Sequence, residues 1–164
     1  MLSAIQIAQY FLSKDPERKM FTKKLIIKNG RKFYEGNARL NKYLHIAQNI
    51  HIAKTGEKLF MDELYAYDNG AVVTEVREKY AVLAERTDTP GFSEDIEIYL
   101  DKIFIAFMNA DLDELIEISH EDPEWINKHN GNSKESQRMD SLSRADEYRN
   151  FYKDIIKVLD RMTI

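Results

Sequence analysis

Residues 37–54, NARLNKYLHIAQNIHIAK, decide the fold, because their apolar side chains recur with the spacing of a long helix. Asn37 is a residue type that caps helix N-termini, and Gly56 is suited to end the helix after Lys54. One stripe of this helix carries Leu40, Leu44, Ala47 and His51, and the positions directly beside it carry Tyr43, Ile46 and Ile50. Because these side chains cover a wide arc, we expect this helix to be buried over much of its surface.

Five further segments have a helical pattern, at residues 3–13, 73–83, 93–107, 111–120 and 148–162. Ser93 can cap the third of them, and Asp111 with Glu114 resembles a capping box at the start of the fourth, which Asp122-Pro123 should end. The core predicted from these patterns includes Ile7, Phe11, Leu44, Ala47, Val76, Ile103, Phe104, Phe107, Ile155 and Leu159.

A β-hairpin is predicted between the first two helices, over about residues 21–35 with strands at 21–28 and 31–35. β-Branched and aromatic residues flank Asn29-Gly30, a dipeptide that accepts positive φ at both central positions of a type I′ turn. Five cations lie close to this turn: Lys23, Lys24, Lys28, Arg31 and Lys32. Such charges keep an edge strand soluble, so they need no ligand to explain them.

Two segments lack a clear period. Residues 59–73 predict a loop with short extended or helical pieces, in which Asp68-Asn69-Gly70 forms a turn, and residues 129–143 predict an exposed polar loop. We therefore expect a mainly α fold, a single helical domain of residues 1–164 with five to six helices and one inserted β-hairpin near the N-terminus.

The composition agrees with a small folded protein. The chain has 164 residues, of which 43% are hydrophobic, and it has no cysteine, which excludes disulfides, thiolate zinc sites and a cysteine nucleophile. Its first residues lack the pattern of a signal peptide, and no apolar run reaches the ~18 residues of a membrane span. We expect a cytoplasmic protein with no membrane partner.

The net charge of −4 hides a strong separation along the chain. Residues 14–42 hold ten basic and three acidic residues, a charge of +7, whereas residues 85–125 hold two basic and thirteen acidic residues, a charge of −11. The simpler explanation is that the two segments face each other in the fold, and the alternative is that they steer a charged partner.

No established catalytic or metal-binding motif is present. His45 and His51 lie six residues apart on one helix and so on different faces, whereas helical ligand pairs usually lie four apart. The acidic residues around His120 are Glu117, Glu121, Asp122 and Glu124, which could hold a divalent cation but more often form a solvated face. We therefore predict no catalytic residue, no metal and no cofactor.

The residues that look selected for a partner lie in the segments without a period. Trp125, the only tryptophan, follows His120 closely, and a buried indole N–H needs an acceptor. Tyr65, Tyr67, Asp68 and Asn69 form a similar candidate turn. Both groups can pack at an edge of the core or present aromatic anchors to another protein.

The segment ARLNKYLHIAQNIHIAKTGEKLFMDELYAYDNGAVVTEVREKY, residues 38–80, resembles the central signature of the Panacea domain family, which includes SocA-like antitoxins. The matching positions are Leu40, Lys42, Tyr43, Leu44, Ala47, Gln48, Gly56, Leu59, Phe60, Asp62, Ala66, Gly70, Val72, Val73, Val76 and Tyr80. Further matches are Leu115, Ser119-His120, Pro123 and Trp125. Three features depart from the pattern: Ala66-Tyr67 replaces Ala-Trp, Gly70-Ala71-Val72 replaces Gly-Pro-Val, and the basic hairpin is an addition.

This resemblance implies a mainly helical protein that binds and neutralises a cognate toxin without catalysing a reaction. We expect the toxin to contact the turn at 65–73 and the loop at 120–125. One alternative is a nucleic-acid-binding regulator that uses the five hairpin cations as phosphate contacts. Another is a metal-dependent enzyme built on His120 with Glu121 or Asp122.

Overall fold

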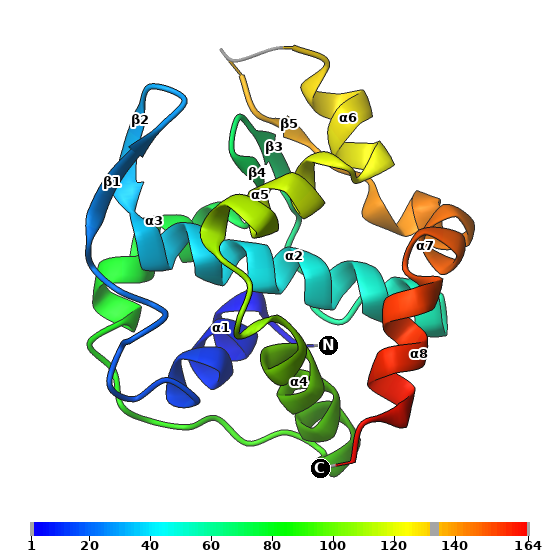
Figure 1. Ribbon diagram of the computed structural model, residues 1–164, viewed down its shortest axis with the longest axis horizontal. Coiled ribbons are helices and arrows are strands. Elements are labelled where there is room, and N and C mark those ends of the chain that lie inside the picture. Colours follow the sequence, from blue (N-terminus) through cyan, green and yellow to red (C-terminus); the bar gives the residue numbers. More distant parts are fainter. Residues whose placement is uncertain (1, 132–134, 164) are drawn as a thin grey trace.

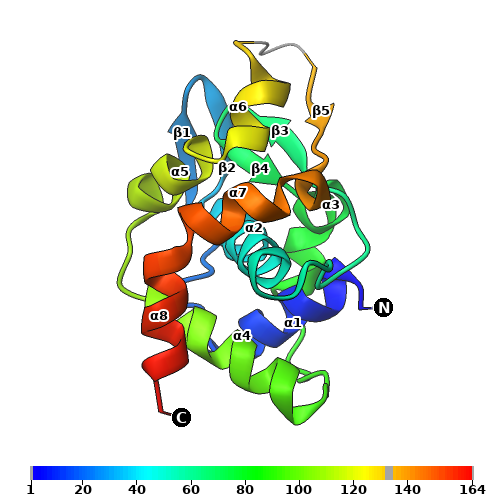
Figure 2. The same ribbon diagram turned by 90° about the vertical axis from the view of Figure 1, so that its right-hand side faces the viewer.

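The computed structural model describes residues 2–131 and 135–163, and helix α2 (Glu35–Thr55) runs through its centre. Every residue from 40 to 50 is buried, so the helix is covered on all sides, as Figure 2 shows in a view close to its axis. The predicted burial of this helix is therefore confirmed. The predicted cap is wrong, because α2 begins at Glu35, and Asn37 lies inside the first turns with its side-chain amide on the carbonyl of Arg77.

The other helices surround α2 (Figures 1 and 2). In the described residues they are α1 (Ala4–Ser13), α3 (Thr74–Leu83), α4 (Glu94–Phe107), α5 (Leu112–His120), α6 (Pro123–His129), α7 (Ala145–Phe151) and α8 (Lys153–Arg161). Ser93 caps α4 through the backbone N–H of Ile96, and Asp111 and Glu114 form the capping box of α5. The sequence patterns predicted these two helix starts correctly.

The fold is mainly helical as expected, but the described residues form eight helices and not five to six. One unexpected helix is α6, because Pro123 at its first position begins a new helix while it ends α5. The C-terminal apolar stripe is also divided into α7 and α8 at Tyr152, whose backbone leaves the helical conformation. A stripe of apolar residues at helical spacing does not reveal such a break.

The predicted hairpin exists but is shorter than expected. Strand β1 (Leu25–Lys28) pairs antiparallel with β2 (Arg31–Tyr34), and Asn29 and Gly30 both have positive φ in the turn. Residues 21–24 are not in the strand, because the carboxylate of Asp15 accepts the backbone N–H groups of residues 19–21 and turns Phe21 into the core. Figure 1 shows the hairpin standing beside the N-terminal end of α2.

A second hairpin occupies the segment predicted as an irregular loop. Strands β3 (Tyr65–Tyr67) and β4 (Gly70–Val72) are joined by a turn at Asp68 and Asn69, which confirms the turn predicted for Asp68-Asn69-Gly70. Strand β5 (Gln137–Arg138) adds to β3, so the sheet order is β4-β3-β5. The described part of segment 129–143 is thus more ordered than predicted, since the 3-10 helix Ser141–Arg144 also begins in it. Residues 132–134 lie outside the described part.

Most of the predicted core is buried. The buried members are Ile7, Phe11, Leu44, Ala47, Val76, Ile103 and Leu159. Phe104, Phe107 and Ile155 are only partly buried and pack against the edge of this core. The full burial predicted for these three residues is wrong. Their helices α4 and α8 lie at the outside of the molecule, so part of the apolar stripe keeps contact with solvent (Figure 2).

The separated charges do face each other. Lys14 pairs with Asp101, Lys23 with Glu85, and Lys28 with Asp113, so three ion pairs join the basic segment to the acidic one. The fold therefore neutralises part of the charge of the basic segment with carboxylates of the acidic segment. In the described residues no helix is both long enough and apolar enough to cross a bilayer.

Two isoleucines of α4 give a matched test of this packing. Ile103 is fully buried, whereas Ile105 is 45% exposed. We expect Ile103→Ala to lower the free energy of unfolding by about 2–5 kcal/mol, because it leaves a cavity in the core, and Ile105→Ala to lower it by less than about 1 kcal/mol. Urea denaturation of both variants measures the difference, and equal losses would contradict the placement of α4.

Candidate functional site

Five of the six predicted partner-binding residues lie together in space. Tyr67, Asp68 and Asn69 of the β3–β4 turn meet His120 at the end of α5 and Trp125 in α6. His129, at the end of α6, joins them. We call these six residues the turn–junction cluster. The sixth predicted residue, Tyr65, lies outside it in the middle of the sheet, where its backbone is opposite Val72 and Arg138.

Hydrogen bonds from side chains to backbone hold the turn in place. The indole Nε1 of Trp125 donates to the carbonyl of Tyr67 at 2.9 Å, which meets the expected need of a packed tryptophan. Nε2 of His120 lies 2.8 Å from the carbonyl of Asp68. Both carbonyls of the turn are therefore bound to the α5–α6 junction, and the cluster is a rigid surface.

The three rings of the cluster are stacked. Trp125 lies between His120, at a centroid distance of 4.2 Å, and His129, at 4.5 Å. Nε2 of His129 also lies 2.8 Å from Oδ1 of Asp68. Burial lowers the pKa of His120, an effect larger than the opposing hydrogen bond to Asp68. All three rings are partly exposed, so the stack is accessible to a partner.

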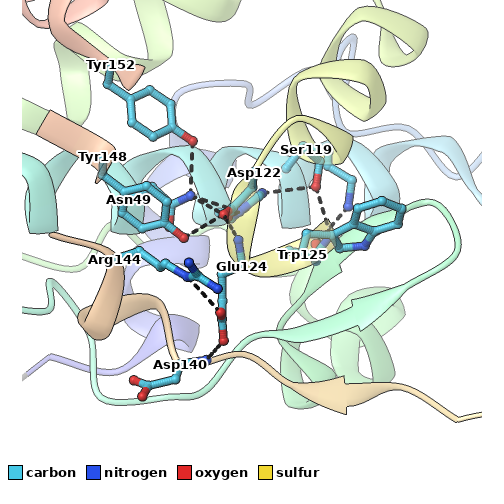
Figure 3. A network of polar contacts seen from close by, with 12 residues as sticks. Asn49, Ser119, Asp122, Glu124, Trp125, Asp140, Arg144, Tyr148 and Tyr152 are labelled. Atoms are coloured by element: carbon cyan, nitrogen blue, oxygen red, sulfur yellow. Dashed lines mark hydrogen bonds and ion pairs between the residues drawn. The ribbon is translucent and has the colours of Figure 1, made fainter. Parts of the chain in front are cut away.

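A buried carboxylate fixes the junction beneath this surface (Figure 3). Oδ2 of Asp122 accepts from Nε2 of His45 at 2.6 Å and from Asn49 at 2.8 Å. Oδ1 accepts from the hydroxyl of Tyr148 at 2.7 Å and from the backbone N–H of Glu124 at 2.8 Å. Burial alone would raise the pKa of Asp122, but the hydrogen bonds, first of all that from His45, hold it below its usual value.

Ser119 completes a Ser–His–Asp arrangement that the sequence did not reveal. Its Oγ lies 3.1 Å from Nδ1 of His45 and accepts the backbone N–H of Ala71 at 2.9 Å. The side chains of Ser119, His45 and Asp122 are all buried, so the hydroxyl is not presented to solvent. The arrangement therefore joins β4 and α5 to α2.

The prediction that the four acidic residues around His120 form a solvated face is wrong for two of them. Glu117 and Glu121 are exposed as expected. Asp122 and Glu124 are buried, and Glu124 binds Nε of Arg144 at 3.0 Å and the backbone N–H of Asp140 (Figure 3). Among the described residues, no group of three His, Asp or Glu side chains could hold a metal ion.

A cleft of about 310 Å³ lies between the first hairpin and the β3–β4 turn. Its charged lining consists of Arg31, Lys32, Lys42, Arg77 and Asp68. The cleft thus contains parts of both predicted sites, the β3–β4 turn and the basic hairpin. Asn29 and Arg31 also contact Asn69 and Asp68 directly, which links the tip of the hairpin to the cluster.

Lys42 is the buried cation of this cleft. It is 1% exposed, and its Nζ donates to the carbonyl of Ala71 at 2.8 Å. Burial lowers its pKa to about 7. Gly70, with a φ of +110°, is required above it, because a Cβ there would lie 2.7 Å from Cε of Lys42 and 2.5 Å from Oγ of Ser119.

The hairpin cations proposed for nucleic acid do not act as one group. Lys23, Lys28 and Arg31 form ion pairs with Glu85, Asp113 and Asp68. Lys32 lines the cleft, and Lys24 is exposed outside it. The sequence showed where these charges lie along the chain but did not show which of them have partners.

A family model described as antitoxin SocA-like, Panacea domain, matches residues 40–126, more than half of the chain. The matched region begins in α2 and ends directly after Trp125. Searches of curated proteins and of solved structures give no match.

The buried carboxylate gives a first test of this site. We expect Asp122→Asn to lower the free energy of unfolding by about 2–4 kcal/mol, because the amide places donors against donors in a buried network. The exposed neighbour Glu121 provides the control, and Glu121→Gln should change stability by less than about 0.5 kcal/mol. Urea denaturation at pH 7 measures both, and a small effect of Asp122→Asn would contradict the network.

The pH dependence of stability tests the burial of Lys42. Its folded pKa of about 7 lies below its ordinary value of 10.5, so between these values the unfolded chain binds a proton that the folded chain has released. The free energy of unfolding should therefore rise with pH in this window, by up to about 1.4 kcal/mol per unit. Urea denaturation from pH 7.5 to 9.5 should show this slope in the wild-type chain and not in Lys42→Met. Parallel pH profiles would contradict it.

Proposed function

Because the chain belongs to the SocA-like Panacea family of antitoxins, we propose that it neutralises a toxin protein by binding it directly and not by catalysis. The family match supports an antitoxin-type function in general. The toxin, the contact surface and the mode of neutralisation are parts of our proposal.

The observation that carries the proposal is the position of the turn–junction cluster within the matched region. Residues 40–126 include every member of the cluster except His129. They exclude the first hairpin, so the feature that the sequence marks as an addition to the family pattern lies outside the match. We therefore assign the toxin contact to the cluster and treat the hairpin as its neighbour.

The cluster has the properties of a protein-binding surface. Its rings are stacked and held by hydrogen bonds, so little conformational entropy is lost when a partner covers them. Ile126, the residue after Trp125 in α6, is 53% exposed, and we propose that this apolar side chain extends the contact surface. Rigid aromatic residues beside an exposed apolar residue are common in the energetic centres of protein interfaces.

The nucleic-acid alternative has less support. Three of the five hairpin cations are engaged by carboxylates of the same chain, and each carboxylate would also repel phosphate. Binding of the oligonucleotide (dT)12 is therefore included below as a test of this alternative.

Co-expression with the product of the adjacent reading frame tests the proposal. We expect the chain to restore growth to cells that carry that toxin and to form a stable complex with it. Ile126→Asp should weaken the complex at least about tenfold, because it places a charge in an apolar contact, and rescue should be lost.

Val158 in α8 provides the matched control, since it is an apolar residue with 52% exposure outside the cluster. Val158→Asp should bind and rescue like the wild type. Equal loss in both variants would place the contact elsewhere, and failure of the wild-type chain to rescue or bind would overturn the proposed function.

A further inference from the structure

We propose that the cleft between the first hairpin and the β3–β4 turn is a carboxylate-binding site, which receives an acidic side chain of the toxin with Lys42 as its innermost cation. The identity of the partner rests on the proposed function, whereas the site itself can be tested without the toxin.

The charges around the cleft are strongly unequal. Within the described part of the chain, four cationic side chains line it, and Asp68 supplies the single carboxylate. Among the described residues, Lys32, Lys42 and Arg77 have no carboxylate within ion-pair distance. By contrast, Lys14, Lys23 and Lys28, which lie outside the cleft in the same basic segment, each have such a partner. The cleft therefore retains a local positive charge that an anion would neutralise.

Lys42 is the strongest element of the site. An ammonium group has three donors, and only the one on Ala71 has an acceptor among the described residues. Burying a cation without a counter-ion is expensive, and a hydrophobic residue would be the less costly choice at a position that is 1% exposed. A carboxylate that enters the cleft supplies both the missing acceptor and the missing charge.

The shape of the cleft favours a protein side chain. The rim is formed by the exposed cations Lys32, Arg77 and Arg31, while Lys42 lies inside. Phe33, Tyr67 and Val72 add apolar walls. A nucleic-acid backbone needs cations spaced along a surface, whereas these cations converge on one hollow of about 310 Å³. An aspartate or glutamate with its apolar neighbours satisfies both the charge and the walls.

Binding should be linked to protonation of Lys42. Its pKa of about 7 leaves part of the population neutral near pH 7, and a bound anion favours the charged form. The other titratable or charged groups that face Lys42 or line the cleft are Arg31 and Lys32 of β2, Arg77 of α3, Asp68 and Tyr67 of β3 and its turn, and His120 of α5. Affinity should therefore decrease as pH rises above 7.

Titration with a small dicarboxylate tests the site in the full chain without any toxin. With ¹³C-labelled lysine, the Cε signal of Lys42, assigned by its loss in Lys42→Met, reports the protonation of Nζ. We expect glutarate to raise the pKa of Lys42 by about half a unit or more. An unchanged pKa in glutarate would overturn the site, and so would a shift that occurs with the oligonucleotide (dT)12 and not with glutarate.

The affinity of cleft variants for the toxin tests whether an acidic side chain of the toxin occupies the cleft. Lys42→Met should weaken the complex at least about tenfold and remove the decrease in affinity above pH 7, and Lys32→Ala, at the exposed rim, should weaken it about threefold. The control is Lys79→Met, because Lys79 is exposed on α3 outside the cleft and pairs with Glu75 of the same helix. It should bind like the wild type.

The outcomes separate the two proposals. If glutarate shifts Lys42 but no toxin complex forms, the proposed function fails and the carboxylate site remains. If the toxin binds the wild type, Lys42→Met and Lys32→Ala equally, the carboxylate site is wrong as a toxin contact and the proposed function remains. Lys32→Ala keeps this conclusion valid if Lys42→Met does not fold.

Discussion

The burial of α2 on all sides is the constraint on which the rest of the structure depends. Because residues 40–50 of this helix have no solvent-facing side, their polar side chains lie inside the protein, where an unpaired polar group is costly. Asn41 accepts from the N–H of Val73, Lys42 donates to Ala71, and Gln48 binds the segment at Leu59 and Phe60. His45 and Asn49 bind Asp122. The polar residues of one helix thus position β4, the preceding loop and the α5–α6 junction.

The sequence predicted what depends on local pattern. The period of apolar residues located α1 to α5, and Asn29-Gly30 located the turn of the first hairpin, since backbone conformation there follows from the residues themselves. Asp122 could not be distinguished from Glu121, although one is buried in a network and the other is exposed. Burial depends on long-range packing. The one available signal was the set of polar residues on a helix predicted to be buried.

The candidate site follows from the same constraint. Asp122 holds α6 against α2 through His45, and this places Trp125 where its indole reaches the β3–β4 turn. The turn itself is anchored from below, because Ala71 is bound by both Lys42 and Ser119. The aromatic surface is therefore rigid on account of polar groups buried beneath it. Their residue types, in segments without a helical period, suggested these residues, but only the fold shows why they lie together.

The cations of the basic segment, residues 14–42, differ in the partners that the fold gives them. The charges of Lys14, Lys23 and Lys28 are neutralised by the acidic segment and hold the hairpin and α1 against it. Lys32 and Lys42 converge with Arg77 of α3 on the cleft, where no carboxylate lies within ion-pair distance of these three among the described residues. Exposed ion pairs of the first kind add little stability. The buried Lys42 opposes folding, and the anion that we propose for the cleft would offset this cost.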